Sequence, residues 1–442
     1  MRLKGQNIVV LGGGESGIGA ALLAHKQGAK VFLSDKGKIK ASYQEELKNI
    51  GIEFEDGQHT KSRILSADEV IKSPGIPDGV PLLKALATNG IPVIGEIEFA
   101  SRFTSAKVLA ITGSNGKTTT ASLIYHLLKS ANIKVQLAGN IGFSFARSLA
   151  ENEPAAVYVI ELSSFQLDSI KTFQPDLAAV LNITADHLDR YHDEIDLYAD
   201  SKLRISKNQQ KTDHFWYLKE DTETHKALQR TSVKAAMHPV SKGDIKGQKI
   251  LVDEEWMDLT QTQLRGKHNA LNALFAYQML RTLGVEKAVL QKGLESFQSV
   301  PHRLESVAII DGVEYINDSK ATNVDAVTYA LDAMTKEIIW IAGGIDKGND
   351  YSGLIELART KVKALICLGK DNTKLKAVFG KIINDITETD NMEQAIAIAQ
   401  AKATKGQVVL LSPACSSFDL FDNYAARGDQ FRTHSRELIP LN

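Results

Sequence analysis

The sequence predicts an α/β protein made of three consecutive domains, each built around a mainly parallel sheet. Its 442 residues are enough for about three domains that each bury a core of their own. Short apolar runs of the kind that form buried strands alternate with segments of helical periodicity, and this alternation is typical of parallel sheets. Several of these runs end at glycine-rich turns. We place the domains at residues 1–95, 96–300 and 301–442.

The first domain opens with a strand and a glycine turn of the kind that binds nucleotides. The apolar run Asn7–Leu11 leads into Gly12–Gly17, whose glycines follow the GxGxxG pattern, and a helix and a second strand carry the chain to Asp35. This pattern is typical of a Rossmann-like domain in which the acidic residue binds a ribose hydroxyl, and alone it would favour NAD. However, the domain is too short for a complete dinucleotide fold. A second strand-to-glycine turn at Ile71–Ile76 further favours a mononucleotide or its diphosphate.

The second domain contains a phosphate-binding loop. The strand Val108–Ile111 enters the loop Thr112–Thr118, and apolar residues at helical spacing follow over Thr119–Ser130. Glycines in such a loop let backbone N–H groups approach phosphate oxygens, and the helix N-terminus adds positive potential. Lys117 is expected at the β- and γ-phosphates and the Thr118 hydroxyl on Mg²⁺. The loop lacks the first glycine of the standard pattern and is the shorter form TGxxGKT; a chance glycine turn is the alternative.

Two further strands of the second domain end at residues that could hold a metal. The strand Val157–Ile160 closes at Glu161, and the strand Ala178–Ile183 leads to His187. Carboxyl ends of parallel strands meet at one edge of a sheet, so these residues are expected beside the phosphate loop. With the Thr118 hydroxyl they offer an oxygen-rich set with one nitrogen, which suits Mg²⁺ or Mn²⁺. An ordinary surface histidine remains the alternative for His187.

The third domain repeats the α/β pattern. We predict strands near Glu337–Ala342, Ala364–Leu368 and Val408–Leu411, with glycine or proline turns at their ends, which favours a second Rossmann-like domain. Residues 209–266 carry no chemical motif that we can interpret.

Composition narrows the class of protein. A net charge of -1 argues against general binding to nucleic acid or to a membrane surface, because neither polyanion would be attracted. Two cysteines are too few for a disulfide framework and fit a reducing compartment. No apolar run is long enough to span a membrane, and the N-terminal run breaks into glycines rather than forming a signal peptide. We therefore expect a cytoplasmic protein with neither a nucleic-acid nor a membrane partner.

Eight motifs stand in an order that resembles one family. They are TGSNGKTT, ELSSFQLD (161–168), NITADHLDRY (182–191), SKLRI (201–205), KHNALNAL (267–274), PHRLE (301–305), NDSKATN (317–323) and LLSPACSSFDLFDNYAARGDQF (410–431). Together they resemble the Mur ligases, ATP-dependent ligases of peptidoglycan precursor synthesis. The second, third and last motifs resemble in particular the member that adds D-glutamate to UDP-N-acetylmuramoyl-L-alanine. Folylpolyglutamate synthase shares the ATP core but not the uridine-type first domain.

The resemblance implies roles for individual residues. Around ATP it implies Gly113, Ser114, Asn115, Gly116, Lys117, Thr118, Thr119, Asn269, Arg303 and Asp318. Around the UDP substrate it implies Glu15, Ser16, Asp35, Lys36, Gly75, Asn140 and His187. Around D-glutamate it implies Thr322, Lys347, Ser417 and Tyr424, the last of which is phenylalanine in more familiar members. The implied metal ligands are Thr118, Glu161, His187 and Lys202, with the lysine carried as a carbamate.

The implied reaction has two steps. The L-alanine carboxylate attacks the γ-phosphate of ATP, and the amine of D-glutamate then attacks the acyl phosphate. The implied catalytic residues are Lys117, Glu161, His187, Lys202, Arg303 and Lys320. We expect ATP with Mg²⁺ or Mn²⁺, and a monomer. Since an acyl phosphate hydrolyses readily, we also expect the third domain to close on the second about a hinge at Ser299–His302.

Two other classes of function remain open from the residues alone. A nicotinamide dehydrogenase would use the GxGxxG turn but would leave the phosphate loop unexplained. A non-enzymatic nucleotide switch would need only ATP binding, and would give no role to His187, Lys202 and Lys347. Without the resemblance, Lys202 would be interpreted as a solvated helix lysine.

Overall fold

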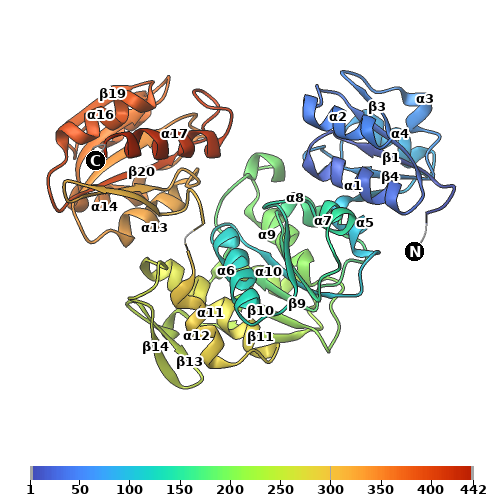
Figure 1. The fold of residues 1–442 in the computed structure, drawn as a ribbon, viewed down its shortest axis with the longest axis horizontal. Helices are drawn as coiled ribbons and strands as arrows, with labels where there is room; N and C mark the ends of the chain where they lie inside the picture. The colour runs from blue at the N-terminus through green and yellow to red at the C-terminus, as the bar shows by residue number, and fades with distance from the viewer. Residues whose placement is uncertain (1–2, 299, 440–442) are drawn as a thin grey trace. The chain divides into compact units, whose positions relative to one another are not determined.

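The computed structural model describes residues 3–298 and 300–439. Contacts divide the chain into two compact units, one of Met1–Lys242 with Phe275–Gly293 and one of Gly243–Leu274 with Leu294–Asn442. Figure 1 shows the α/β character of both units. This division differs from the three predicted domains, whose boundaries stay predictions. The hinge prediction includes Ser299, which lies outside the described residues.

The first unit begins with a five-stranded parallel sheet of order β3-β2-β1-β4-β5. Its strands are β1 Asn7–Leu11, β2 Lys30–Asp35, β3 Glu53–Asp56, β4 Glu69–Lys72 and β5 Val93–Gly95, and its helices are α1 Glu15–Lys26, α2 Ala41–Asn49, α3 Lys61–Ile64, α4 Pro81–Thr88 and α5 Glu96–Ser101. The strand order reverses between β1 and β4, and ligands of such sheets bind at that point. Both predicted glycine turns follow these two strands. A Cβ on Gly17 would overlap the carbonyl of Gly12, so the turn requires glycine there.

A six-stranded parallel sheet of order β11-β10-β9-β6-β8-β7 completes the first unit. Its strands are β6 Lys107–Thr112, β7 Val135–Gly139, β8 Val157–Glu161, β9 Leu177–Val180, β10 His214–Leu218 and β11 Ala236–Val240. The helical elements of this region are α6 Lys117–Ser130, α7 Phe145–Glu151, α8 Ser164–Asp168, η1 Leu188–Tyr191, α9 Ile195–Leu203, η2 Arg204–Ser206 and α10 Thr222–Arg230. Two further helices, α11 Gly266–Thr282 and α12 Lys287–Ser296, each belong partly to both units. The prediction of a strand over Ala178–Ile183 was too long, because the Ile183 N–H turns away to the Asp221 carboxylate, 2.7 Å away.

The second unit contains a small antiparallel sheet and a larger mixed one. The small sheet consists of β12 Ile245–Lys246, β13 Lys249–Val252 and β14 Glu255–Asp258, preceded by η3 Lys242–Asp244. The large sheet has the order β15-β16-β20-β17-β18-β19, antiparallel only between its first two strands. Its strands are β15 Glu305–Ile310, β16 Val313–Asn317, β17 Ile338–Gly343, β18 Val362–Leu368, β19 Asp385–Thr389 and β20 Val408–Ala414, and its helices are α13 Val324–Ala333, η4 Ser352–Leu354, α14 Ile355–Lys361, α15 Thr373–Phe379, α16 Met392–Lys402 and α17 Tyr424–Glu437.

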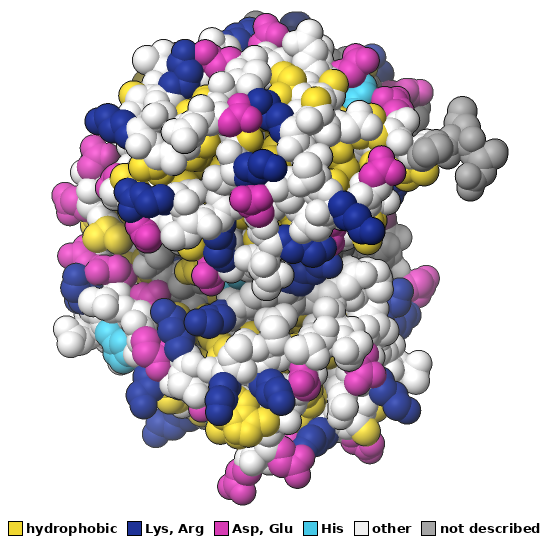
Figure 2. Space-filling view, turned by 90° about the vertical axis from the view of Figure 1, so that its left-hand side faces the viewer, with side chains coloured by type: hydrophobic (Ala, Val, Ile, Leu, Met, Phe, Trp, Pro, Cys, Tyr) yellow, Lys and Arg dark blue, Asp and Glu magenta, His cyan; other side chains and the backbone are white. Residues whose placement is uncertain are grey.

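Both faces of the large sheet are buried. Along β17, Ile338 and Trp340 enter one core cluster, whereas Ile339 and Ile341 enter the other. This alternation follows from the two-residue period of a strand, and it explains why the strand is an uninterrupted apolar run. On the face drawn in Figure 2, basic and acidic side chains are intermixed, which agrees with the small net charge. In the described part of the chain, no helix is long and apolar enough to cross a membrane.

Candidate active site

The phosphate-binding loop joins β6 to α6 and has the left-handed backbone that glycine permits. Gly113 has a φ of 148° and Gly116 a φ of 86°, and Gly116 caps the helix that begins at Lys117. A side chain at Gly113 would lie about 3.1 Å from the Leu181 side chain. The Lys117 Nζ donates to the carbonyls of Gly113 and Ser114, each at 2.8 Å. The Lys117 side chain thus folds back and holds the backbone of its own loop.

The segment after β9 braces this loop. Ser114 Oγ donates to the Thr184 carbonyl at 2.9 Å and accepts from the Thr184 N–H at 2.9 Å. The Asn182 side chain accepts from the Asn115 N–H at 2.9 Å and donates to its carbonyl at 3.0 Å. Paired hydrogen bonds therefore hold both Ser114 and Asn115 in the loop. Because the loop is ordered before a phosphate binds, binding costs less conformational entropy.

Lys202 lies beneath the loop rather than in solvent. Its side chain is about 1% exposed on α9, and its Nζ donates to the Gly113 carbonyl at 2.8 Å. The Tyr198 ring lies 4.4 Å from the same nitrogen. Burial, and then the neighbouring Lys117, hold the pKa of Lys202 well below its usual value, against the opposing carboxylates of Asp186, Glu161 and Asp168. A lysine in this position favours its neutral amine.

Glu161 ends β8 with one oxygen held and one oxygen available. The Asn140 side chain donates to its Oε1 at 2.8 Å, whereas the buried Oε2 has no hydrogen-bond partner among the described residues. A buried carboxylate oxygen with no donor is costly unless a cation meets it. Together with the Thr118 hydroxyl on the first turn of α6, this residue therefore fits a divalent cation that prefers oxygen.

His187 occupies a different environment from Glu161. It has a left-handed φ of 54°, its side chain is 46% exposed, and its ring lies 5.3 Å from that of Phe165. The described residues contain no group of three or more His, Cys, Asp or Glu side chains that could hold a metal. Lys117 and Glu161 are close enough to Lys202 for their charges to change its pKa. His187 stays a predicted ligand.

Most of the predicted uridine residues lie at the carboxyl ends of strands in the first sheet, whereas Asn140 and His187 follow strands of the second. The Asp35 carboxylate accepts from the N–H groups of Gly13 and Gly37, at 2.5 and 2.6 Å. The carbonyl of Gly75 accepts from the Arg190 guanidinium at 3.3 Å. Ser16 lies in the first turn of α1, and Lys36 is exposed directly after β2. Asp35 therefore shapes the first glycine turn as well as lying beside it.

In the second unit, the buried Asp318 carboxyl group lies within electrostatic reach of the half-buried Arg303. Burial raises the pKa of Asp318 to about 7, and the Arg303 guanidinium opposes that rise. Ser412 Oγ donates to Asp318 Oδ2 at 2.9 Å, whereas the buried Arg303 Nε has no partner within the described ranges. Asn269, near the start of α11, donates to the Arg265 carbonyl at 2.9 Å. The Arg303 Nε and the Asp318 carboxyl group could therefore form hydrogen bonds with a ribose or a phosphate.

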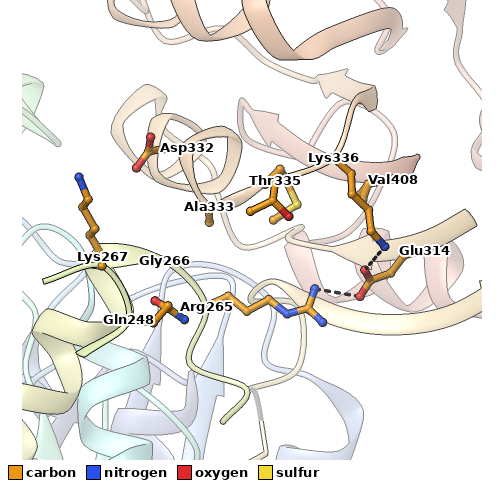
Figure 3. Close-up of a pocket in the computed structure, with 12 residues that line it drawn as sticks. Gln248, Arg265, Gly266, Lys267, Glu314, Asp332, Ala333, Thr335, Lys336 and Val408 are labelled. Atoms are coloured by element: carbon orange, nitrogen blue, oxygen red, sulfur yellow. Dashed lines mark hydrogen bonds and ion pairs between the residues drawn. The ribbon is translucent and has the colours of Figure 1, made fainter. Parts of the chain in front are cut away.

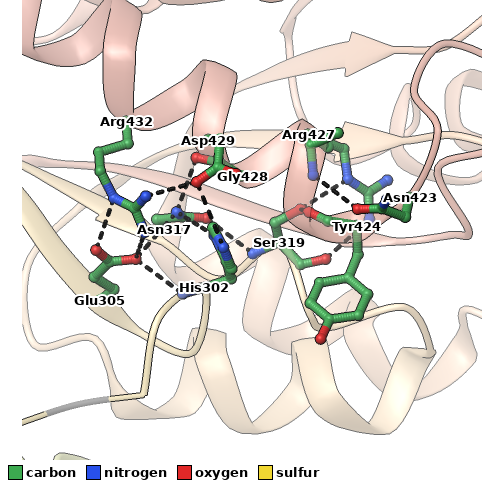
Figure 4. A network of polar contacts seen from close by, with 11 residues as sticks. His302, Glu305, Asn317, Ser319, Asn423, Tyr424, Arg427, Gly428, Asp429 and Arg432 are labelled. Carbon is green, nitrogen blue, oxygen red and sulfur yellow. Dashed lines mark hydrogen bonds and ion pairs between the residues drawn. The ribbon is translucent and has the colours of Figure 1, made fainter. Parts of the chain in front are cut away.

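A polar network joins three of the sequence motifs in the second unit (Figure 4). The Asn317 side chain approaches His302 Nδ1 at 3.0 Å and donates to the Gly428 carbonyl at 3.0 Å. A Cβ on Gly428 would overlap the His302 ring, so only glycine fits there. Ser319 Oγ donates to the Tyr424 carbonyl at 2.7 Å. The network fixes the backbone immediately before Lys320, whose own N–H donates to the His302 carbonyl at 3.1 Å.

The residues predicted for D-glutamate differ in exposure. The Lys320 ammonium lies 5.5 Å from the Tyr424 ring, which is 36% exposed. Ser417 is buried, Thr322 is half-buried, and Lys347 is exposed after β17. No contact shown here tests their predicted role.

The comparisons with known proteins match three consecutive parts of the chain. Three family models match: the Mur ligase MurD-like N-terminal domain over residues 6–95, the Mur ligase middle domain over 111–280 and the Mur ligase glutamate ligase domain over 302–415. A relative from Christiangramia forsetii, named UDP-N-acetylmuramoylalanine--D-glutamate ligase, is 49% identical over 98% of this chain and 100% of its own length. This chain belongs to the Mur ligase family. A relative of the same name from Bacteroides fragilis is 47% identical over 98% of this chain and 100% of its own.

Solved structures agree with the Mur ligase fold. The UDP-N-acetylmuramate-alanine ligase MurC from Thermotoga maritima matches with a TM-score of 0.64 and 18% identity, over 98% of this chain and 99% of its own. The MurF ligase of the same organism, solved in complex with ADP, has a TM-score of 0.64 and 17% identity, over 99% and 96%. At such identities the likeness shows the fold alone. It confirms the predicted α/β architecture of three domains.

Sequence reasoning missed three features of this Mur ligase. Arg427 is buried at about 1% exposure and donates to the carbonyls of Ser319 and Cys415. Arg147 is buried among carboxylates that are distant in sequence. Neither arginine has a local pattern that distinguishes it from a solvated one, since both are buried by long-range packing.

The third missed feature is a pocket of about 510 Å³ in the second unit (Figure 3). Its walls include Gln248, Lys267 and Asp332, and Glu314 accepts from Arg265 at 2.8 Å and lies 3.6 Å from the Lys336 ammonium. None of the predicted site residues lines this pocket. It is therefore distinct from the predicted nucleotide residues.

Proposed function

We propose that this chain is an ATP-dependent ligase that joins D-glutamate to UDP-N-acetylmuramoyl-L-alanine in peptidoglycan precursor synthesis. The observation that carries the proposal is the 49% identity, over nearly the whole chain, to a relative with that name. The site geometry supports it, because Glu161 and Lys202 are both buried beside a pre-ordered phosphate loop. A dehydrogenase would not require these residues.

The reaction follows from the poor electrophilicity of a carboxylate. An oxygen of the L-alanine carboxylate attacks the γ-phosphorus of ATP, the bond to the β-phosphate oxygen breaks, and ADP leaves. The neutral amine of D-glutamate then attacks the acyl carbon, loses a proton, and the phosphate leaves with the acyl C–O bond electrons. Lys117 and the loop N–H groups hold the phosphates, so most of the catalysis is positioning and charge neutralisation.

A divalent cation, Mg²⁺ or Mn²⁺, would be held by Thr118 and Glu161, with His187 and Lys202 as further ligands. It supplies charge neutralisation of the phosphoryl group that is transferred. We assign Lys202 as a carbamate: its neutral amine adds to CO₂ and releases one proton, which converts a neutral group into an anion. The burial of Lys202 at the loop supports this assignment.

The remaining roles are proposed from the family motifs. Gly113–Thr119, Asn269, Arg303 and Asp318 bind ATP; Glu15, Ser16, Asp35, Lys36, Gly75, Asn140 and His187 bind the UDP substrate; Thr322, Lys347, Ser417 and Tyr424 bind D-glutamate, with Lys320 stabilising the reacting centre. We also propose a cytoplasmic monomer with domains at 1–95, 96–300 and 301–442, and with neither nucleic acid nor membrane as a partner.

One assay tests the proposed function against its alternatives. ADP release is measured with ATP and each of the two other substrates omitted in turn. The ligase requires both for ADP release, a non-enzymatic nucleotide switch binds ATP with no ADP release that depends on either substrate, and a dehydrogenase neither binds ATP nor releases ADP. D-Glutamate should support turnover, whereas L-alanine, L-lysine and diaminopimelate should not. Equal rates with D- and L-glutamate would contradict the stereochemical part of the proposal.

A further inference from the structure

Helices α1 and α7 pack against each other in the first unit (Figure 1). Helix α1 begins directly after the first glycine turn, to which we assign the uridine nucleotide. Helix α7 follows the loop that carries Asn140, to which we assign the acyl end of the same substrate. The contact between the two helices therefore links the two ends of one ligand. The inference drawn from it rests on the proposed function.

Arg147 on α7 is the centre of this contact. Its side chain is about 6% exposed, and its Nε donates to Glu15 Oε1 at 3.0 Å. Its two terminal nitrogens donate to the two oxygens of Glu46, at 2.6 and 3.0 Å. Glu151 accepts from the same guanidinium at 2.8 Å. One buried arginine thus joins α7 to α1 and α2, and bidentate pairs of this kind fix orientation as well as distance.

Both oxygens of the Glu15 carboxylate accept hydrogen bonds at this contact. Besides Arg147, its Oε1 accepts from the Ser144 N–H at 3.0 Å, and its Oε2 accepts from the Tyr43 hydroxyl at 3.1 Å. Both oxygens are therefore used within the protein. The part of Glu15 that remains for a nucleotide is its backbone, in the first turn of α1.

The two helices also approach each other too closely for a side chain. A Cβ on Gly19 of α1 would overlap Ser144 Oγ and lie 2.8 Å from the Arg147 backbone nitrogen. At the far end of the contact, the Lys26 ammonium donates to the Ala150 carbonyl at 2.5 Å. The approach is thus fixed by sterics in the middle and by polar contacts at both ends.

The loop between β7 and α7 connects this contact to the phosphate-loop region. Asn140 donates from its backbone to the Glu161 carbonyl at 2.9 Å and from its side chain to Glu161 Oε1 at 2.8 Å. The Gly139 N–H donates to the Phe143 carbonyl at 3.0 Å, which closes the loop immediately before Ser144. A short, hydrogen-bonded path therefore runs from the carboxylate of Glu161 to that of Glu15.

We propose that Arg147 is a positioning residue that sets the distance between the uridine turn and the acyl-end residues Asn140 and Glu161. It touches no reacting atom. A substrate that spans two sites binds tightly and reacts quickly only when their separation matches its length, because the second contact is then made at high effective concentration. The nucleotide turn itself lies within the first sheet and does not need Arg147 to form.

The test compares a fragment of the substrate with the whole of it. In Arg147→Met, we expect the Kd for UDP, measured by calorimetry, to change less than about twofold, and the KM for UDP-N-acetylmuramoyl-L-alanine to rise about tenfold or more. Arg147→Lys should recover part of the KM, since it keeps the charge but not the fork. Glu46→Gln, which leaves the bond to Glu15, should shift the KM in the same direction but less.

Arg63→Met is the matched control, because it removes an arginine–glutamate pair, to Glu53, within the same nucleotide-binding sheet and away from α7. This variant should change neither the Kd for UDP nor the KM for UDP-N-acetylmuramoyl-L-alanine. Equal weakening of UDP and of the whole substrate in Arg147→Met would overturn the proposal, as would no change in either. If that variant does not fold, Arg147→Lys is held to the same expectation for UDP, together with a rise of at least about threefold in the KM for the whole substrate. Wild-type protein that turns over no UDP-N-acetylmuramoyl-L-alanine would instead refute the proposed function.

Discussion

Replacing Lys202 by methionine should separate activity from stability. The substitution keeps the length of the side chain and removes its nitrogen, which donates to the Gly113 carbonyl at 2.8 Å. If Lys202 supplies a carbamate oxygen to the metal, losing that ligand should cost about 3 kcal/mol of transition-state stabilisation. This corresponds to a loss of about 150-fold in kcat.

The thermal stability of Lys202→Met should not fall with its activity. A lysine that is about 1% exposed buries a polar amine at a cost in free energy, and an apolar side chain of similar size avoids that cost. The Gly113 carbonyl keeps its bond from Lys117 at 2.8 Å. We therefore expect the Tm of Lys202→Met to stay the same or to rise by about 2–4 °C.

Steady-state ADP release and thermal unfolding measure the two effects, and mass spectrometry of wild-type protein in bicarbonate detects the carbamate. Lys202→Ala should lose activity similarly, and acetate or formate should restore part of it by entering the space that the side chain leaves. Lys207→Met, at an exposed position after the same helix, is the control and should keep full activity. Near-normal kcat in both Lys202 variants would refute the assigned role.

Three further predictions concern other parts of the protein. Glu161→Gln should raise the Mg²⁺ concentration needed for half-maximal activity at least tenfold, because the unpartnered Oε2 would no longer carry charge; unchanged Mg²⁺ dependence would contradict the site. Burial raises the pKa of Glu96 from its usual value of 4.5 to about 8 in the folded state. The folded chain therefore keeps a proton that the unfolded chain loses between these values, so stability should fall by on the order of 5 kcal/mol as pH rises through this window, and Glu96→Gln should flatten the curve. Tyr424→Phe should leave the KM for D-glutamate within about threefold, whereas Tyr424→Ala should raise it about fivefold through loss of the ring near Lys320.

The fold was predictable because its patterns are local. The run before Gly113 is apolar on both faces of a buried strand, and the glycines after it meet the needs of a left-handed turn. Within residues 209–266, in which we found no chemical motif, the strands around Lys249–Val252 are only two to four residues long. Short elements carry too few residues to establish a period.

The site was predictable in its residue types but not in its burial. A lysine on α9 such as Lys202 looks like any solvated helix lysine, because what buries it is the packing of α9 beneath a loop nearly ninety positions earlier. The same holds for Arg147, whose partners Glu15 and Glu46 are more than a hundred positions away. Charged residues buried by such long-range contacts leave no periodic trace in the sequence, so only a family motif or a structure reveals them.

The two lysines at the phosphate loop explain why a change of charge at one of them would be useful. Both Lys117 and Lys202 donate to the Gly113 carbonyl. The neighbouring Lys117 and burial both disfavour an ammonium at Lys202, so this amine adds no second positive charge for a phosphate. A carbamate at Lys202 would instead attract Lys117 and a metal ion, and it would complement the unpartnered Glu161 oxygen. With a carbamate at Lys202, the loop would offer the Lys117 cation to the phosphates, and the carbamate and Glu161 would offer two anions to a metal ion.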